Sequence, residues 1–194
     1  GLELGGAVHV DDARLGDGVL HGHVPVQQPD HGLQGVADDA RPAGRAQGRE
    51  QLAEQPSSWP ELLERLRAQV HKNIGWFRGR EVDMIGDRPL AIFDGPARAI
   101  RCAWAIKESA SRLGVQMRAG LHTGECDMVD GKVGGIAAEI GVQVANLAGA
   151  GEVLVSNTVK DLVAGSGITF DDKGSYRFAG ASGDWRLFAV RSVK

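Results

Sequence analysis

The amino-acid sequence predicts an α+β fold, in which an antiparallel sheet carries helices packed on one face. Two observations support this prediction. Apolar residues recur at helical spacing in several segments, and short strand-like segments lie between those helices. The predicted order of elements along residues 58–194, αββαββαβαβββ, contains consecutive strands joined by short turns, which favours antiparallel pairing.

The composition divides the 194-residue chain near residue 58. Residues 1–57 contain no aromatic residue and no isoleucine, whereas every Phe, Trp and Tyr lies from Trp59 onward. A segment without these side chains buries little apolar area, which does not offset the entropy lost on ordering its backbone. We therefore expect residues 1–57 to be a low-complexity segment, either a disordered extension or GC-rich DNA translated in a non-native frame. Residues 58–194 are expected to form the folded domain.

The first predicted helix runs to about Trp76. Ser58-Trp59-Pro60-Glu61 has the form of a capping box with a proline in the first turn. The apolar residues that recur at helical spacing behind it are Leu62, Leu63, Leu66, Val70 and Ile74. Residues 80–94 then predict a β-hairpin, because two apolar runs flank a Gly86-Asp87 turn that places a carboxylate at the tip.

The rest of the domain continues this alternation. Asp94-Gly95-Pro96 predicts the start of a helix that ends at Gly114, and residues 115–121 alternate like a strand. Asp130-Gly131 is a favoured hairpin turn. The remaining predicted elements are a hairpin at 128–133, a helix at 134–148, a buried strand at 153–155, a short helix at 157–163, and strands at 168–171, 175–178 and 184–191.

Charge and hydropathy argue against several function classes. The formal net charge is −3, which gives no electrostatic reason to expect nucleic acid as a partner. No apolar run reaches the ~18 residues of a membrane span, and no basic region followed by an apolar run indicates a signal peptide. Cys102 and Cys126 lie in unrelated contexts, so we expect reduced packing residues. These features predict a cytoplasmic protein without a membrane segment.

Several separate segments carry one recognisable pattern. They are residues 77–82 (FRGREV), 93–100 (FDGPARAI), 118–125 (RAGLHTGE) and 151–156 (GEVLVS). In their order and spacing they resemble the catalytic domains of class III nucleotidyl cyclases, over about residues 59–191. The resemblance implies a ferredoxin-like domain that converts ATP or GTP into a cyclic 3′,5′-nucleotide and pyrophosphate. It also implies a head-to-tail dimer with active sites at the interface, formed with a second copy or another cyclase domain.

The resemblance implies two divalent cations, Mg²⁺ or Mn²⁺, held by two aspartates that activate the ribose 3′-hydroxyl and neutralise the triphosphate. Asp87, at the hairpin tip, matches the second of these aspartates. The first falls near Ala43, where the sequence predicts no strand. Asp38 and Asp39 lie close by, but the sequence around them is not the family's. We therefore expect the first strand to be missing or replaced and one metal ligand to be retained.

The other functional positions of the family hold different residues here. The asparagine and arginine that stabilise the transition state fall on Glu139 and Gln143. The base-reading lysine and aspartate fall on Asp83 and Lys132, which reverses both charges and leaves the choice between ATP and GTP open. The phosphate-binding lysine falls on Ala179. Glutamine does not supply the charged fork of arginine, and a glutamate repels a triphosphate.

Three more polar residues are candidates on or after the 115–121 strand. His122 is a candidate base, although the resemblance makes it a structural strand residue. Glu125 and Asp127 are carboxylates that could substitute as metal ligands near Asp87.

Three functional hypotheses follow from these substitutions. The first is a degenerate cyclase homology domain, inactive or severely impaired. The second is an active adenylate cyclase that uses non-standard residues. The third is a non-enzymatic nucleotide-binding or dimerisation module that keeps the fold. Cyclic product would favour the second, and nucleotide binding without turnover would favour the third.

Overall fold

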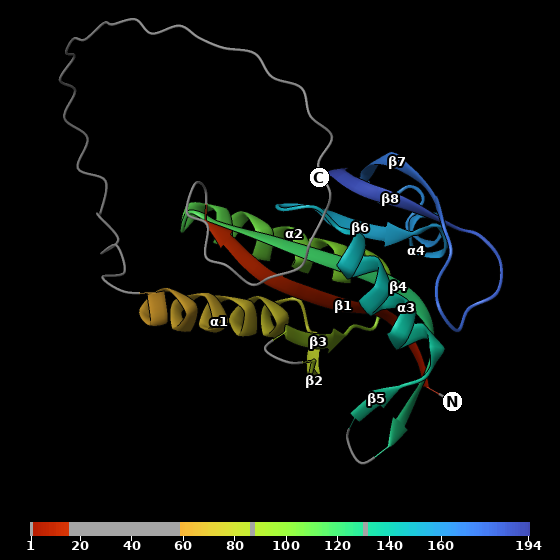
Figure 1. Ribbon diagram of the computed structural model, residues 1–194, viewed down its shortest axis with the longest axis horizontal. Coiled ribbons are helices and arrows are strands. Elements are labelled where there is room, and N and C mark those ends of the chain that lie inside the picture. The colour runs from red at the N-terminus through yellow and green to blue at the C-terminus, as the bar shows by residue number, and fades with distance from the viewer. Residues whose placement is uncertain (1, 16–58, 86–87, 130–131) are drawn as a thin grey trace, which may run out of the picture.

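The computed structural model describes residues 2–15, 59–85, 88–129 and 132–194 (Figure 1). The helices are α1 (Trp59–Trp76), α2 (Pro96–Arg112), α3 (Ile136–Leu147) and α4 (Asn157–Leu162). The strands are β1 (Leu2–Leu15), β2 (Arg80–Ile85), β3 (Arg88–Ile92), β4 (Val115–Val129), β5 (Lys132–Gly134), β6 (Val153–Ser156), β7 (Thr169–Tyr176) and β8 (Trp185–Ser192). The predicted α+β class is confirmed.

The strands form one sheet in the order β2-β3-β1-β4-β6-β8-β7, and β5 pairs with β4 beside this path (Figure 1). Strand pairs are antiparallel, except that β4 and β6 run parallel. A parallel pair requires a crossover connection, and α3 lies in the connection between β4 and β6. The sheet is therefore antiparallel as predicted but for this one pair.

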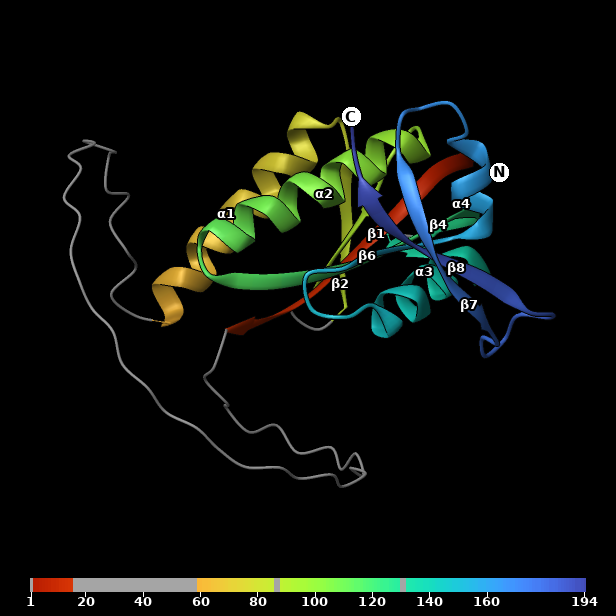
Figure 2. The ribbon, with the colours of Figure 1, turned by 90° about the horizontal axis from the view of Figure 1, so that it is seen from above.

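Helices lie on both faces of the sheet. One core joins α1, α2 and α4 to a sheet face that includes Leu121 and Val155. A separate cluster joins Ile140 of α3 to Leu154 and Leu187 on the other face. Successive strand residues point to opposite faces, so Leu154 and Val155 mark the two sides of β6. The prediction of helices on one face holds for α1, α2 and α4, whereas α3 lies opposite them (Figure 2).

Strand β1 is the main departure from the sequence prediction. It lies between β3 and β4, so that Ala7 is opposite Ile92 on one side and His122 on the other (Figure 1). Leu2–Leu15, which belong to the segment expected to be disordered or non-native, form an internal strand of the sheet. A strand paired on both sides satisfies its backbone groups through its neighbours, and this does not require aromatic side chains of its own.

The remainder of the N-terminal segment, residues 16–58, lies outside the described residues. Asp38, Asp39 and Ala43 fall within it. The division of the chain near residue 58 and the non-native reading frame remain predictions.

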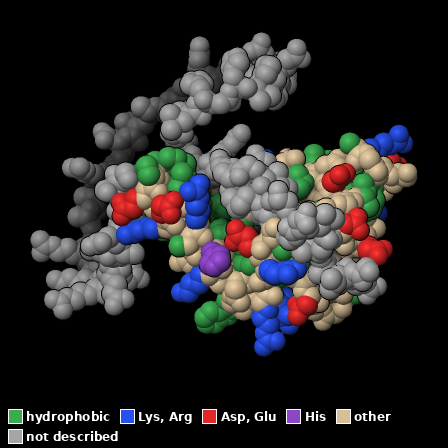
Figure 3. All heavy atoms as spheres, turned by 90° about the horizontal axis from the view of Figure 1, so that it is seen from below, with side chains coloured by type: hydrophobic (Ala, Val, Ile, Leu, Met, Phe, Trp, Pro, Cys, Tyr) green, Lys and Arg blue, Asp and Glu red, His purple; other side chains and the backbone are tan. Residues whose placement is uncertain are grey.

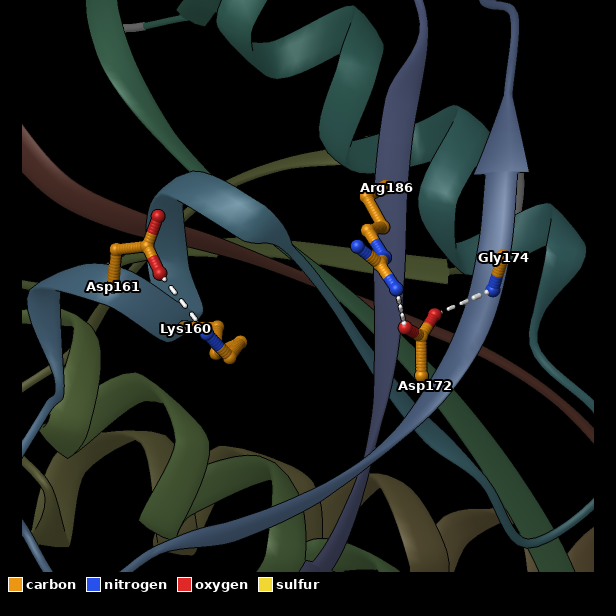
Figure 4. A network of polar contacts seen from close by, with 5 residues as sticks. All are labelled: Lys160, Asp161, Asp172, Gly174 and Arg186. Atoms are coloured by element: carbon orange, nitrogen blue, oxygen red, sulfur yellow. Dashed lines mark hydrogen bonds and ion pairs between the residues drawn. The ribbon is translucent and has the colours of Figure 1, made fainter.

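Strand β7 replaces two of the predicted short strands. Asp172-Lys173-Gly174 separates these two predicted strands, yet it lies inside β7 at a shift in the register with β8. Gly174 has a φ of +89°, and its backbone N–H donates to Asp172 at 2.8 Å. Arg186 of β8 also donates to the Asp172 carboxylate (Figure 4), which lowers the pKa of Asp172. This segment therefore forms a bulge, not the end of a strand.

Both cysteines are free and buried. Burial raises the pKa of the Cys102 thiol to about 12, so this thiol stays protonated and acts as a packing residue. Among the described helices, none combines the length and the apolar character that crossing a bilayer requires.

Candidate functional site

The RAGLHTGE segment of β4 packs closely against α3. A methyl group added at Gly120 would collide with the backbone of Ala145, and one added at Gly124 would lie 2.8 Å from Cβ of Ala137. Both facing helix residues are alanines, the smallest side chains that favour a helix. The glycines of this motif thus have a structural explanation in the close contact between strand and helix.

His122 lies between these glycines and is buried, with 5% of its surface exposed. Its Nδ1 lies 2.8 Å from Oγ of Ser156, which is fully buried on β6. The ring also contacts Trp185 edge-on, with the ring centroids 5.2 Å apart. Burial lowers the pKa of His122 to about 4, so the imidazole is neutral near pH 7. This environment favours the structural interpretation of His122 over a catalytic base.

Glu139 and Gln143 lie one turn apart on α3, and the structure brings them together with Ala179. Gln143 donates through Nε2 to the carbonyl oxygen of Ala179 at 3.1 Å, and its Oε1 accepts from the Ala179 N–H at 2.8 Å. A pocket of about 480 Å³, open to solvent, is lined by Glu139, Val142, Gln143, Ala179 and Gly180. Three positions that the resemblance links to phosphate chemistry thus adjoin one pocket, and its described lining contains no Lys or Arg.

The positions that the resemblance links to base reading lie on β2 and β5, which pair with different strands, β3 and β4. Asp83 pairs through its backbone with Leu90, and Lys132 pairs with Val129. Val82 and Val133, their neighbours in sequence, belong to one hydrophobic cluster. The fold therefore brings the two elements together, while the side chains of Asp83 and Lys132 lie outside the described ones.

The structure describes only some of the residues that were expected to bind metal ions. Asp87 lies outside the described residues. Glu125 and Asp127 are exposed on β4, and within the described part of the chain no group of three or more His, Cys, Asp or Glu is placed to hold a metal ion. The described donors therefore do not fit the two-cation site that the resemblance implies.

Strand β1 carries two carboxylates that sequence reasoning missed. Because β1 is antiparallel to β3, the residues that follow His9, which is opposite Leu90, run toward the start of β3. Asp11, two residues after His9, lies opposite Arg118 of β4, and Asp12 follows it. The missed signal is the alternation of apolar and polar residues from Val8 onward, which ends at this acidic pair.

Comparisons with known proteins agree with this fold. No protein-family model matches the chain, and no curated protein matches it. The structure resembles that of an adenylate/guanylate cyclase/hydrolase from Silicibacter pomeroyi, with a TM-score of 0.61 and 22% identity over 74% of this chain and 90% of that one.

Two further solved structures cover nearly the whole chain. The adenylyl cyclase CyaB from P. aeruginosa has a TM-score of 0.67 and 16% identity, over 97% of this chain and 94% of that one. The guanylate cyclase domain of RhGC from Catenaria anguillulae, in complex with GTP, has a TM-score of 0.64 and 14% identity, over 99% of this chain and 98% of that one. The chain therefore has the fold of class III adenylate/guanylate cyclase catalytic domains, as its sequence motifs predict.

Proposed function

We propose that this chain is a class III nucleotidyl cyclase homology domain whose own conversion of ATP or GTP into a cyclic nucleotide is absent or severely reduced. The observation that carries the proposal is the state of Gln143. Its amide both donates to and accepts from the backbone of Ala179, at the position where the family resemblance places a transition-state arginine.

The chemistry explains why these positions matter. Negative charge builds up on the phosphate oxygens during cyclisation, and donors fixed in advance stabilise it. The loss of one such donor costs about 3–4 kcal/mol of transition-state stabilisation, or roughly a hundredfold to a thousandfold in rate. Here Gln143 supplies no charge, Ala179 supplies no donor side chain, and the exposed carboxylate of Glu139 repels a triphosphate.

Product formation is the direct test. The full chain is incubated with ATP or GTP and with Mg²⁺ or Mn²⁺, and cyclic nucleotide is measured by chromatography. We expect no product above the level of a heat-denatured control. Turnover that disappears in an Asp87→Ala variant would instead establish an active cyclase with non-standard residues.

A dimerisation module is the second candidate, and the exposed surface of α3 favours it. Ile136 and Leu147, at the two ends of the helix, each leave 45% of their surface exposed. On the face seen in Figure 3, the described acidic and basic side chains are interspersed. Apolar side chains that are exposed in a free chain become buried in the cores of protein interfaces.

Sedimentation velocity tests this second candidate. We expect a dimer that dissociates in Ile136→Ser and Leu147→Ser variants and persists in Leu162→Ser, a control on α4 where 62% of the side chain is exposed. A chain that stays monomeric at every concentration would rule out self-association. Nucleotide titration of the same samples separates a nucleotide-binding module from one that only dimerises.

A further inference from the structure

Strand β7 lies at one end of the sheet, where it pairs with β8 and has no second neighbour in the described part of the chain (Figure 1). An open edge offers its free N–H and C=O groups to a strand of another chain, and proteins protect such edges with bulges and charged side chains. Strand β7 contains both. Between Asp172 and Gly174 the register with β8 shifts, so that Lys173 is the extra residue of a bulge.

The peptide unit at this bulge is engaged at both of its polar groups by side chains of β7 itself. The N–H of Gly174 donates to Oδ1 of Asp172 at 2.8 Å. The carbonyl oxygen of Lys173 accepts from the hydroxyl of Tyr176 at 3.0 Å. In a regular antiparallel strand these two groups point to opposite sides, one toward the paired strand and one toward the free edge. Because both already have partners within β7, this unit does not bond an added strand.

Residues outside β7 position the same bulge. Arg186 of β8 donates to the carboxylate of Asp172 (Figure 4). The ammonium group of Lys173 lies 2.9 Å from Oε1 of Glu152, in the connection between α3 and β6, and Oε2 of Glu152 accepts from the N–H of Gly149 at 2.7 Å. Both the carboxylate that engages the backbone and the extra residue of the bulge are therefore held from neighbouring elements.

We propose that Asp172 and Tyr176 close the free edge of β7, and that without them this edge pairs with the same edge of a second copy of the chain. The charges favour that occupant. In an antiparallel pair centred between Asp172 and Lys173, each Asp172 is opposite the Lys173 of the other copy, and opposite charges across such a pair are favourable. The closed edge leaves only residues 169–172 and 175–176 on either side of the bulge, and both are shorter than an ordinary strand. This inference does not depend on nucleotide chemistry.

Hydrogen exchange at low protein concentration tests the contact of Asp172 with the backbone. Asp172→Val removes the acceptor for the Gly174 amide. Asp171→Val is the matched control, because Asp171 is also exposed on β7 and forms an ion pair with Arg191 of β8 at 3.8 Å. We expect the Gly174 amide to exchange about tenfold faster in Asp172→Val than in Asp171→Val. Equal rates would overturn the role of Asp172.

Sedimentation velocity over a range of concentrations tests the closure of the edge. Asp172→Val combined with Tyr176→Phe frees both groups of the peptide unit. We expect this double variant to form larger species than the unaltered chain as the concentration rises, with Asp171→Val sedimenting like the unaltered chain. A double variant of unchanged size would overturn the proposal. An equal increase in Asp171→Val would also overturn it, because lost charge would then be the cause.

Circular dichroism checks that each of these proteins is folded. If the double variant unfolds, Tyr176→Phe takes its place, because it removes a single hydroxyl and keeps the ring. We expect Tyr176→Phe to increase the size of the sedimenting species in the same direction by a smaller amount. A folded Tyr176→Phe that sediments like the unaltered chain at every concentration would then contradict the closure.

Discussion

The two sides of α3 differ in how far they follow the cyclase pattern. On the inner side, Ala137 and Ala145 meet the glycines of the β4 motif at contact distance, and this motif matches the resemblance. On the outer side, Glu139 and Gln143 occupy the two positions where the resemblance places transition-state groups, and neither matches. One helix thus keeps the close contacts that hold the fold on its inner side, while its outer side differs from what the resemblance implies.

The difference follows from what each side contacts. The inner side packs against a strand, where an added methyl group strains its surroundings. The outer side borders a pocket open to solvent, where most substitutions change stability by less than about 0.5 kcal/mol. Packing therefore constrains the inner residues of the helix more tightly than the outer ones.

Gly120→Ala should have the largest effect on the inner side. The new methyl group meets the backbone of Ala145, which cannot move without shifting the helix. We expect a loss of unfolding free energy of about 3 kcal/mol or more, measured by urea denaturation. Gly134→Ala is the control, because nothing lies within 4 Å of the added methyl group. Similar losses in both variants would show that the contact between β4 and α3 is not the cause.

The next effect is a dependence of stability on pH that comes from His122. Burial holds its pKa at about 4 in the folded state, below the ordinary 6.5, so the unfolded chain binds the proton first as the pH falls. The stabilisation is complete above pH 6.5 and is lost progressively down to about pH 4. Its full size is up to about 3 kcal/mol.

Urea denaturation at several pH values measures this effect. His122→Asn should flatten the curve in that window, because asparagine does not titrate there. His71→Asn is the matched control, since 82% of the His71 side chain is exposed. An unchanged slope in His122→Asn would assign the dependence to other groups.

Gly124→Ala should lower the unfolding free energy by less than Gly120→Ala does. The added methyl group lies 2.8 Å from a side-chain atom, Cβ of Ala137, not from backbone. We expect a loss of about 1–3 kcal/mol, part of which Ala137→Gly should recover despite the cost of a helical glycine. A double-mutant cycle measures this coupling. Ala145→Gly should not recover Gly120→Ala, because the obstacle there is the backbone itself.

The sequence predicts most of the domain from Trp59 onward because its elements have local signals. The apolar spacing of Leu62, Leu66, Val70 and Ile74 predicts α1, and all four are buried. Strand β1 has no such strong signal, and its order comes from pairing with β3 and β4. The predicted break between strands at residues 172–174 is absent for the same reason, because β7 pairs with β8 along this segment.

The candidate site could likewise be predicted from the sequence only in part. The three positions that the motif comparison singles out, Glu139, Gln143 and Ala179, border one pocket, because the fold fixes the helix face and the following hairpin. The motif comparison does not predict that Gln143 bonds the backbone of Ala179, since the contact joins residues far apart in sequence and depends on the path of the connection between β7 and β8. Tertiary contacts of this kind leave no local pattern in the sequence.

The smallest effect on stability is expected on the outer side, from Glu139→Asn combined with Gln143→Arg. Both residues border the solvent-open pocket, so we expect the unfolding free energy to change by less than about 1 kcal/mol. We also expect no cyclic product, because the double variant restores transition-state donors without supplying a second metal aspartate. Building the F-T-D-I-x-G-S-T motif of the family into β1, with and without these two substitutions, separates the two deficits. Activity of the double variant alone would mean that carboxylates already present, such as Asp11 and Asp12 of β1, fill the metal role.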